Sequence, residues 1–147
     1  MNVRELTIEV TCKNLPGIRF ADKEPVYLGI QKGREVVDAC PADQEPVIFR
    51  PTFKIGRQSN GAPNFLGPFA QGVPGERFFY LSWGVRHPDQ RFEMFRRAKV
   101  HLNHLPWRSI ETALSRNRPI QVVLDMTDGK GGPRCASLRA GSAEWKI

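Results

Sequence analysis

Short runs in which every second residue is apolar restrict the fold of this chain more than any other feature. Between Leu6 and Cys12 the apolar residues alternate with polar ones, which is the period of two expected of a strand with one buried face. The same period returns between Ile120 and Met126. Further strands are indicated at 26–31, 35–39, 46–55, 78–83, 97–102, 135–138 and 144–147. Turn signals between such runs predict a mainly β protein.

Helical periodicity occurs in one segment, near 106–116. Pro106 can occupy the first turn there, and an apolar stripe follows at Trp107, Ile110, Ala113 and Leu114. We therefore predict an antiparallel β-sandwich or partly open β-barrel of about seven to nine strands with this one helix. A length of 147 residues with 40% hydrophobic content suits a single domain over 1–147.

Three details of strand pairing can be predicted. The runs 26–31 and 35–39 are close enough to form a hairpin. Pro51 lies inside the run 46–55, which favours an edge position or a bulge because proline has no N–H to donate. The strand at 78–83 carries large side chains on both faces, so we expect it to be central.

The charge of the chain favours an anionic partner. The chain has 22 Lys and Arg against 15 Asp and Glu, a formal net charge of +7, and the segment 86–108 holds six basic and two acidic residues. The alternation in 97–102 places Arg97, Lys99 and His101 on one side of a strand as a cationic stripe. Such a stripe occurs in polyanion sites, but it is more typical of a solvated basic face.

A long uncharged stretch rich in glycine and proline, Gln58–Gly75, separates two predicted strands. A loop of this length without secondary structure is typical of a binding loop, a lid or an Ω-loop. Its amides Asn64 and Gln71 lie among Phe65, Leu66 and Phe69, a mixture that suits the rim of a pocket. The same residues also suit a loop that is anchored on the core.

No constellation of residues indicates a metal, a cofactor or a catalytic centre. His101 and His104 are three apart, so on a strand they would face opposite sides, and no further ligand completes a set. The three cysteines are odd in number and far apart, which indicates reduced thiols rather than a disulfide framework. An enzymatic alternative would use Cys135, beside Arg134, as a nucleophile. It would otherwise use an Asp125/Asp128 acid–base pair.

The sequence contains no apolar run that approaches the roughly 20 residues needed to cross a bilayer. The N-terminal residues alternate in polarity and contain no continuous apolar region of a signal peptide. We therefore expect a soluble, cytoplasmic protein that does not contact membranes.

Three segments carry a family resemblance: PNFLGPFAQGVPGERFFYLSWG at 63–84, RRAKVHL at 96–102 and GGPRCASL at 131–138. With them, the chain resembles a small bacterial family of uncharacterised proteins that is known only as a domain of unknown function. The resemblance covers nearly the whole chain and implies a single domain, but no activity, cofactor or catalytic residue. It also implies that the loop 63–72, the strand 78–84 and the pair Arg96 and Arg97 belong to one constellation.

These observations favour a binding module for an anionic small molecule or an acidic peptide over an enzyme. The expected binding residues come from the loop 58–75 and from the strands that follow it: Asn64, Phe65, Phe69, Gln71, Tyr80, Arg96, Arg97 and Lys99. Nucleic-acid binding ranks third, because no RRM, KH or cold-shock motif accompanies the basic and aromatic residues. The aromatic cluster is also compatible with a homodimer surface.

Overall fold

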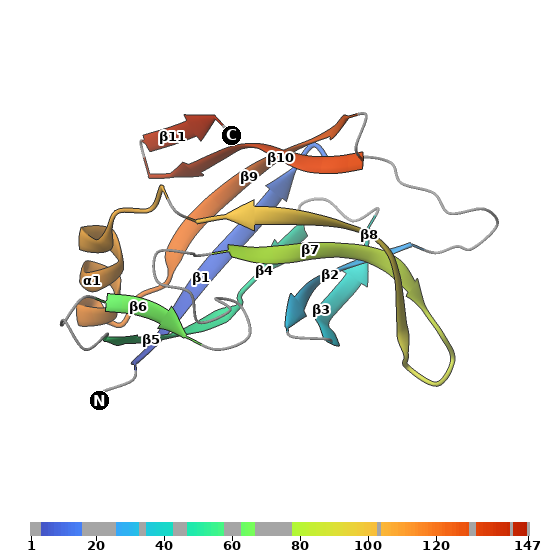
Figure 1. The fold of residues 1–147 in the computed structure, drawn as a ribbon, viewed down its shortest axis with the longest axis horizontal. Helices are drawn as coiled ribbons and strands as arrows, with labels where there is room; N and C mark the ends of the chain where they lie inside the picture. Colours follow the sequence, from blue (N-terminus) through green and yellow to red (C-terminus); the bar gives the residue numbers. More distant parts are fainter. Residues whose placement is uncertain are drawn as a thin grey trace.

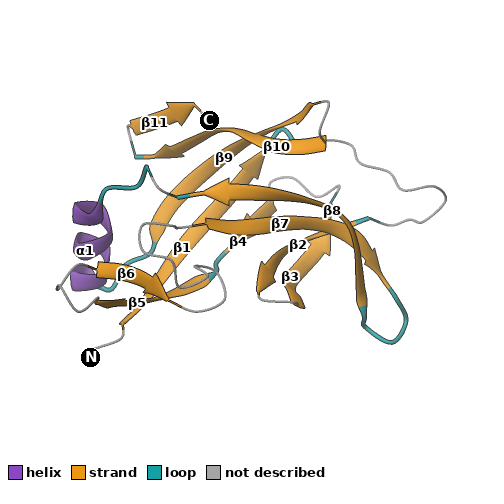
Figure 2. Cartoon of the chain, in the orientation of Figure 1, coloured by secondary structure: helices purple, strands orange, loops and turns teal. Residues whose placement is uncertain are grey.

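In the computed structural model, the residues described are 4–15, 26–32, 35–42, 47–57, 63–66, 78–102, 104–129, 132–141 and 143–146. Within them lie eleven strands and one helix (Figures 1 and 2). The elements are β1 (Arg4–Lys13), β2 (Tyr27–Lys32), β3 (Glu35–Pro41), β4 (Val47–Phe49), β5 (Thr52–Arg57), β6 (Pro63–Leu66), β7 (Phe78–Arg86), β8 (Phe92–His101), α1 (Trp107–Arg116), β9 (Ile120–Gly129), β10 (Gly132–Ala140) and β11 (Ala143–Lys146).

The strands form two sheets whose directions cross in the view of Figure 1. The larger sheet has the order β11-β10-β9-β1-β5-β6, with β4 also paired to β1, and the smaller has the order β3-β2-β7-β8. β1 and β9 are parallel, and the other described pairs are antiparallel. The described strands do not close into a barrel. The prediction of a mainly β, sandwich-like fold with one helix is therefore confirmed.

The core comes from the inward faces of both sheets. Alternate residues of β1 are buried from Leu6 to Cys12, and the same holds for Phe79, Leu81 and Trp83 on β7. Trp83 is the largest fully buried side chain of the described core. On β1 the period of two that is visible in the sequence thus separates a buried face from an outer face. β7 is buried on both faces over most of its length, and Tyr80 is its half-buried exception.

β7 is the central strand of the site region, as predicted. It lies between β2 and β8 in the smaller sheet, and β2 pairs with β3 as the predicted hairpin. The register of β7 with β8 shifts once, between Trp83 and Gly84, so Phe95 is an extra residue on β8. From Arg96 to His101 the register is continuous, which fixes the side on which each basic residue of that segment points.

Two predictions about the region before β7 were wrong. The run 46–55 is two strands rather than one edge or bulged strand, because Pro51 has no N–H to donate and interrupts the pairing with β1. The Pro51 carbonyl still accepts a hydrogen bond from the Ile8 N–H at 3.0 Å. β4 pairs with β1, whereas β5 lies between β1 and β6 and is not an edge. The predicted loop Gln58–Gly75 contains β6, and the rest of it lies outside the described residues.

The helix α1 packs at one end of the larger sheet (Figure 2). Pro106 is its N-cap, and Asn117 ends it in a left-handed conformation with φ of 51°. Its buried residues are Ile110 and Ala113. The Arg4 guanidinium donates a hydrogen bond to the Leu114 carbonyl, which ties the helix C-terminus to β1. Within the described residues no helix has the length and apolar character to span a membrane.

Candidate functional site

The outer face of β7 and β8 gathers aromatic and basic side chains. Cross-strand partners share a face of a sheet, and the register pairs Phe78 with His101 and Tyr80 with Lys99. Arg97, two residues before Lys99, lies on the same face, because the residues between them on β8 and β7 point into the core. We call these five residues the cationic face.

The two strongest bases of the cationic face lie over its rings. The Arg97 Cζ atom is 4.3 Å from the centroid of the Tyr80 ring, and the Lys99 Nζ atom is 4.0 Å from the centroid of the Phe78 ring. Each base therefore leans past its direct partner toward the next ring along β7, in the same direction. A cation–π contact at an exposed site contributes about 0.5–1 kcal/mol, enough to favour one position of each charged group.

Within the described residues, no acidic side chain neutralises the charges of Arg97 and Lys99. Both side chains are exposed, and in the part of the chain that the structure describes neither has a carboxylate partner. Arg50 shows the contrast, because its Nε atom lies 3.1 Å from the Glu9 carboxylate on the larger sheet. Among the described residues, the cationic face thus presents to solvent two positive charges that have no acidic partner.

The aromatic rings of the cationic face lie beneath its basic groups. Phe78 is 5% exposed and Tyr80 is half-buried, and the two rings meet edge to face with their centroids 5.7 Å apart. The His101 ring lies 6.3 Å from the Phe78 ring, also measured between centroids. Because the basic groups lie over the rings, little ring surface is left for stacking by a nucleic-acid base.

The described residues next to Arg97 and Lys99 on β7 and β2 are uncharged. Ser82, the partner of Arg97, is fully buried, and its hydroxyl has no hydrogen-bond partner among the described residues. β2 places Gly29 beside Ser82 and Gln31 beside Tyr80. No described acid on these two strands therefore stands next to the basic residues. The position of these β2 residues beside β7 could not be predicted from the sequence, because the β2–β7 pairing joins segments about 50 residues apart.

The structure separates Arg96 from Arg97. Arg96 precedes Arg97 on β8 and points to the other side, where a Cβ atom at Gly132 of β10 would lie 3.9 Å from its Cδ atom. Its Nη1 atom donates a hydrogen bond to the Phe95 carbonyl at 3.2 Å. Of the predicted binding residues, Tyr80, Arg97 and Lys99 are thus brought together and Arg96 is not.

The remaining predicted binding residues belong to the segment 58–75. β6 pairs Asn64 with Gly56 and Phe65 with Ile55 in the larger sheet. The side chains of Asn64 and Phe65, and the residues Phe69 and Gln71, lie outside the described residues. The part of the prediction that involves the loop therefore stays a prediction.

The thiol of the enzymatic alternative is buried. Cys135 is 3% exposed, and its Sγ atom donates a hydrogen bond to the Ser137 carbonyl at 3.2 Å. Burial raises the pKa of this thiol to about 11 and that of Cys12 to about 12. A thiol with such a pKa is protonated at neutral pH, which opposes a role as a thiolate nucleophile.

The carboxylate of the enzymatic alternative has a structural partner. Asp125 accepts a hydrogen bond from the Asn14 side-chain amide at 2.7 Å, which joins the middle of β9 to the residue that follows β1. The side chain of Asp128 lies outside the described residues. Within the described part of the chain, no group of three His, Cys, Asp or Glu residues is placed to hold a metal ion.

The thiols lead to a prediction about alkaline pH. The pKa values of Cys12 and Cys135 are raised from the ordinary value of 9.0, so the stability that their burial gives is present below about pH 9. It is lost as the pH rises through about 11 and 12. We expect denaturant midpoints to fall over this range, and to fall less in a Cys12→Ala/Cys135→Ala variant. Native protein at pH 8 should leave both thiols unlabelled by a maleimide, and rapid labelling of Cys135 would contradict this description.

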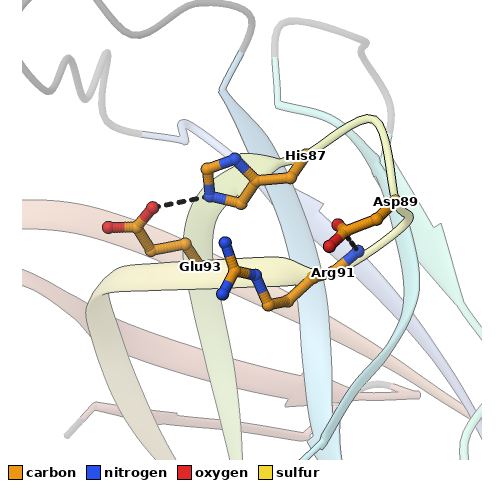
Figure 3. Close-up of polar contacts among 4 residues, drawn as sticks. All are labelled: His87, Asp89, Arg91 and Glu93. Atoms are coloured by element: carbon orange, nitrogen blue, oxygen red, sulfur yellow. Dashed lines mark hydrogen bonds and ion pairs between the residues drawn. The ribbon is translucent and has the colours of Figure 1, made fainter.

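The turn between β7 and β8 satisfies its own polar groups (Figure 3). The His87 Nε2 atom lies 2.7 Å from a Glu93 carboxylate oxygen, and the Asp89 carboxylate accepts the Arg91 backbone N–H at 3.0 Å. Gln90 adopts a positive φ of 72°, and its N–H donates to the His87 carbonyl. These contacts hold the hairpin, so we assign the turn a structural role.

The fold and the cationic face define a mainly β, sandwich-like domain with a basic outer strand. The chain belongs to a family of unknown function, DUF5990, whose model matches residues 6–147. The predicted resemblance to a family of unknown function is confirmed. No curated protein and no solved structure matches the chain.

Proposed function

We propose that this protein is a binding module for an anionic partner, which docks on the cationic face of β7 and β8. The observation that carries the proposal is the pair of exposed cations, Arg97 and Lys99, which lie over Tyr80 and Phe78 and have no carboxylate partner in the described part of the chain. Arg50, by contrast, lies next to an acid of the protein itself, the Glu9 carboxylate. Two adjacent bases without an acid favour a partner that brings the negative charge with it.

The rings beneath Arg97 and Lys99 make these two basic groups suited to binding an anion. A guanidinium that lies over a ring keeps its in-plane N–H donors for an anion, and an ammonium keeps the donors that point away from the ring. Because the rings already limit where the two groups lie, less side-chain entropy is lost when a partner binds. Hydrogen bonds between charged groups contribute about 1.5–3 kcal/mol, more than neutral ones.

The proposal is tested by a thermal-shift panel of inorganic phosphate, nucleotides, glutamate-rich peptides and oligonucleotides, each at low and moderate salt. An anion that binds the native state raises the melting temperature, and added salt reduces the shift. We expect Arg97→Ala/Lys99→Ala to lose most of the shift.

The matched control is Arg108→Ala/Arg118→Ala, which removes the same charge from exposed positions in and just after α1. This control should keep most of the shift. If the two double variants lose the shift equally, binding reflects net charge and the proposal is wrong.

A further inference from the structure

We infer that the anionic partner is an extended polypeptide with acidic side chains at alternate positions, lying along the outer face of β8. The inference rests on the proposed function and specifies its partner. Three observations support it: the spacing of the basic residues, the absence of acids among their described neighbours on β7 and β2, and the covered state of the rings.

The spacing is that of a regular strand. Arg97, Lys99 and His101 follow one another at every second residue in the part of β8 where the register with β7 is continuous. Strand residues rise about 3.3 Å each, so their Cα atoms repeat at about 6.6 Å. Arg97 and Lys99 both lean by one position in the same direction, so the repeat is kept at their charged groups.

An extended peptide reproduces this repeat. Its alternate side chains point to one side, so acids at positions 1, 3 and 5 all face the row of bases. A helix matches less well, because residues four apart are turned by about 40° relative to one another, and the third acid leaves the contact face. Three successive bases of β8 therefore fit an extended acidic segment better than a helical one.

The surroundings complement such a partner. The neighbours of the row on β7 and β2, namely Ser82, Tyr80, Gly29 and Gln31, are uncharged, so no described acid in these rows would repel a carboxylate. The Phe78 and Tyr80 rings are under the basic groups, and Phe78 is 5% exposed. A nucleic acid would therefore contact Arg97, Lys99 and His101 through its phosphates alone, without the stacking of nucleobases that usually accompanies single-strand binding.

The test compares peptides of identical composition by fluorescence anisotropy. One is TETETET, with three glutamates at alternate positions, and the other is TTEEETT, with the glutamates adjacent. We expect the alternating peptide to bind about ten-fold more tightly, the effect of about one additional well-placed charged contact. Arg97→Gln and Lys99→Gln should each weaken the alternating peptide by about five- to ten-fold, whereas Arg108→Gln should not.

The outcomes separate the inference from the proposed function. The two peptides could bind with equal affinity and both lose binding in the Arg97→Ala/Lys99→Ala variant. This result would contradict an extended partner but would still support an anion site on the cationic face. If neither peptide binds at low salt and phosphate and nucleotides cause no response, both the extended partner and the proposed anion-binding function are wrong. An oligothymidylate that binds more tightly than the alternating peptide, through Arg97 and Lys99, would replace the peptide with a nucleic acid. Melting curves without ligand show whether each variant is folded.

Discussion

Replacement of Trp83 by alanine is expected to lower the free energy of unfolding by about 3–5 kcal/mol. The Trp83 side chain is 0% exposed, and β7, which carries it, pairs on both sides. Its indole N–H has no hydrogen-bond partner among the described residues, so the loss comes from packing and from the cavity that remains. Equilibrium denaturation in urea measures the change.

Two comparisons sharpen this prediction. Trp83→Phe keeps part of the buried ring and should lose less stability than Trp83→Ala. Met94 is 41% exposed, so Met94→Ala removes a large apolar side chain from the surface and should change stability by about 0.5 kcal/mol or less. If Trp83→Ala lost no more than Met94→Ala, the two sheets would not be packed on this residue.

Gly84→Ala is expected to lower the free energy of unfolding by about 3 kcal/mol, at the upper end of the range for overpacking. A Cβ atom at Gly84 would lie 2.2 Å from the Glu93 carbonyl oxygen and 2.6 Å from a Phe92 ring carbon. The carbonyl is backbone on the facing strand, so relief requires the β7–β8 pair to separate next to the shift in register. Thermal and urea denaturation report the loss.

Gly141 provides the contrasting glycine. Its added Cβ atom would meet nothing within 4 Å, but its φ is +63°. Gly141→Ala should therefore cost about 1 kcal/mol from backbone conformation alone. A Gly84→Ala variant as stable as Gly141→Ala would show that β7 and β8 are farther apart than described.

Several strands could be predicted, either because an apolar face alternates with a polar one or because large apolar residues fill both faces. The alternation from Leu6 to Cys12 locates β1 directly, and large residues on both faces of β7 indicate its central position. The break at Pro51 was visible, but its result was not. Whether proline ends a strand or divides it into two depends on the partner strand, here β1, which is distant in sequence.

The candidate site was predictable in part. The period of two places Arg97 and Lys99 on one outer face, as the structure has them. The same period places Arg96 and Arg97 on opposite faces of the strand. The prediction that grouped these two neighbours in one binding site did not take this into account. The rings beneath the bases could not be predicted, because the diagonal contacts with Tyr80 and Phe78 depend on the exact register of β7 and β8.

The measurement that tests the central claim most directly is an NMR titration of isotopically labelled protein with the alternating glutamate peptide. We predict that the amide signals of Arg97, Lys99 and His101, and of Tyr80 on the adjoining strand, shift together and saturably, and that salt reverses the shifts. Shifts confined to other basic surfaces, such as Arg108 and Arg118 near α1, would contradict the assignment of the binding site to the cationic face.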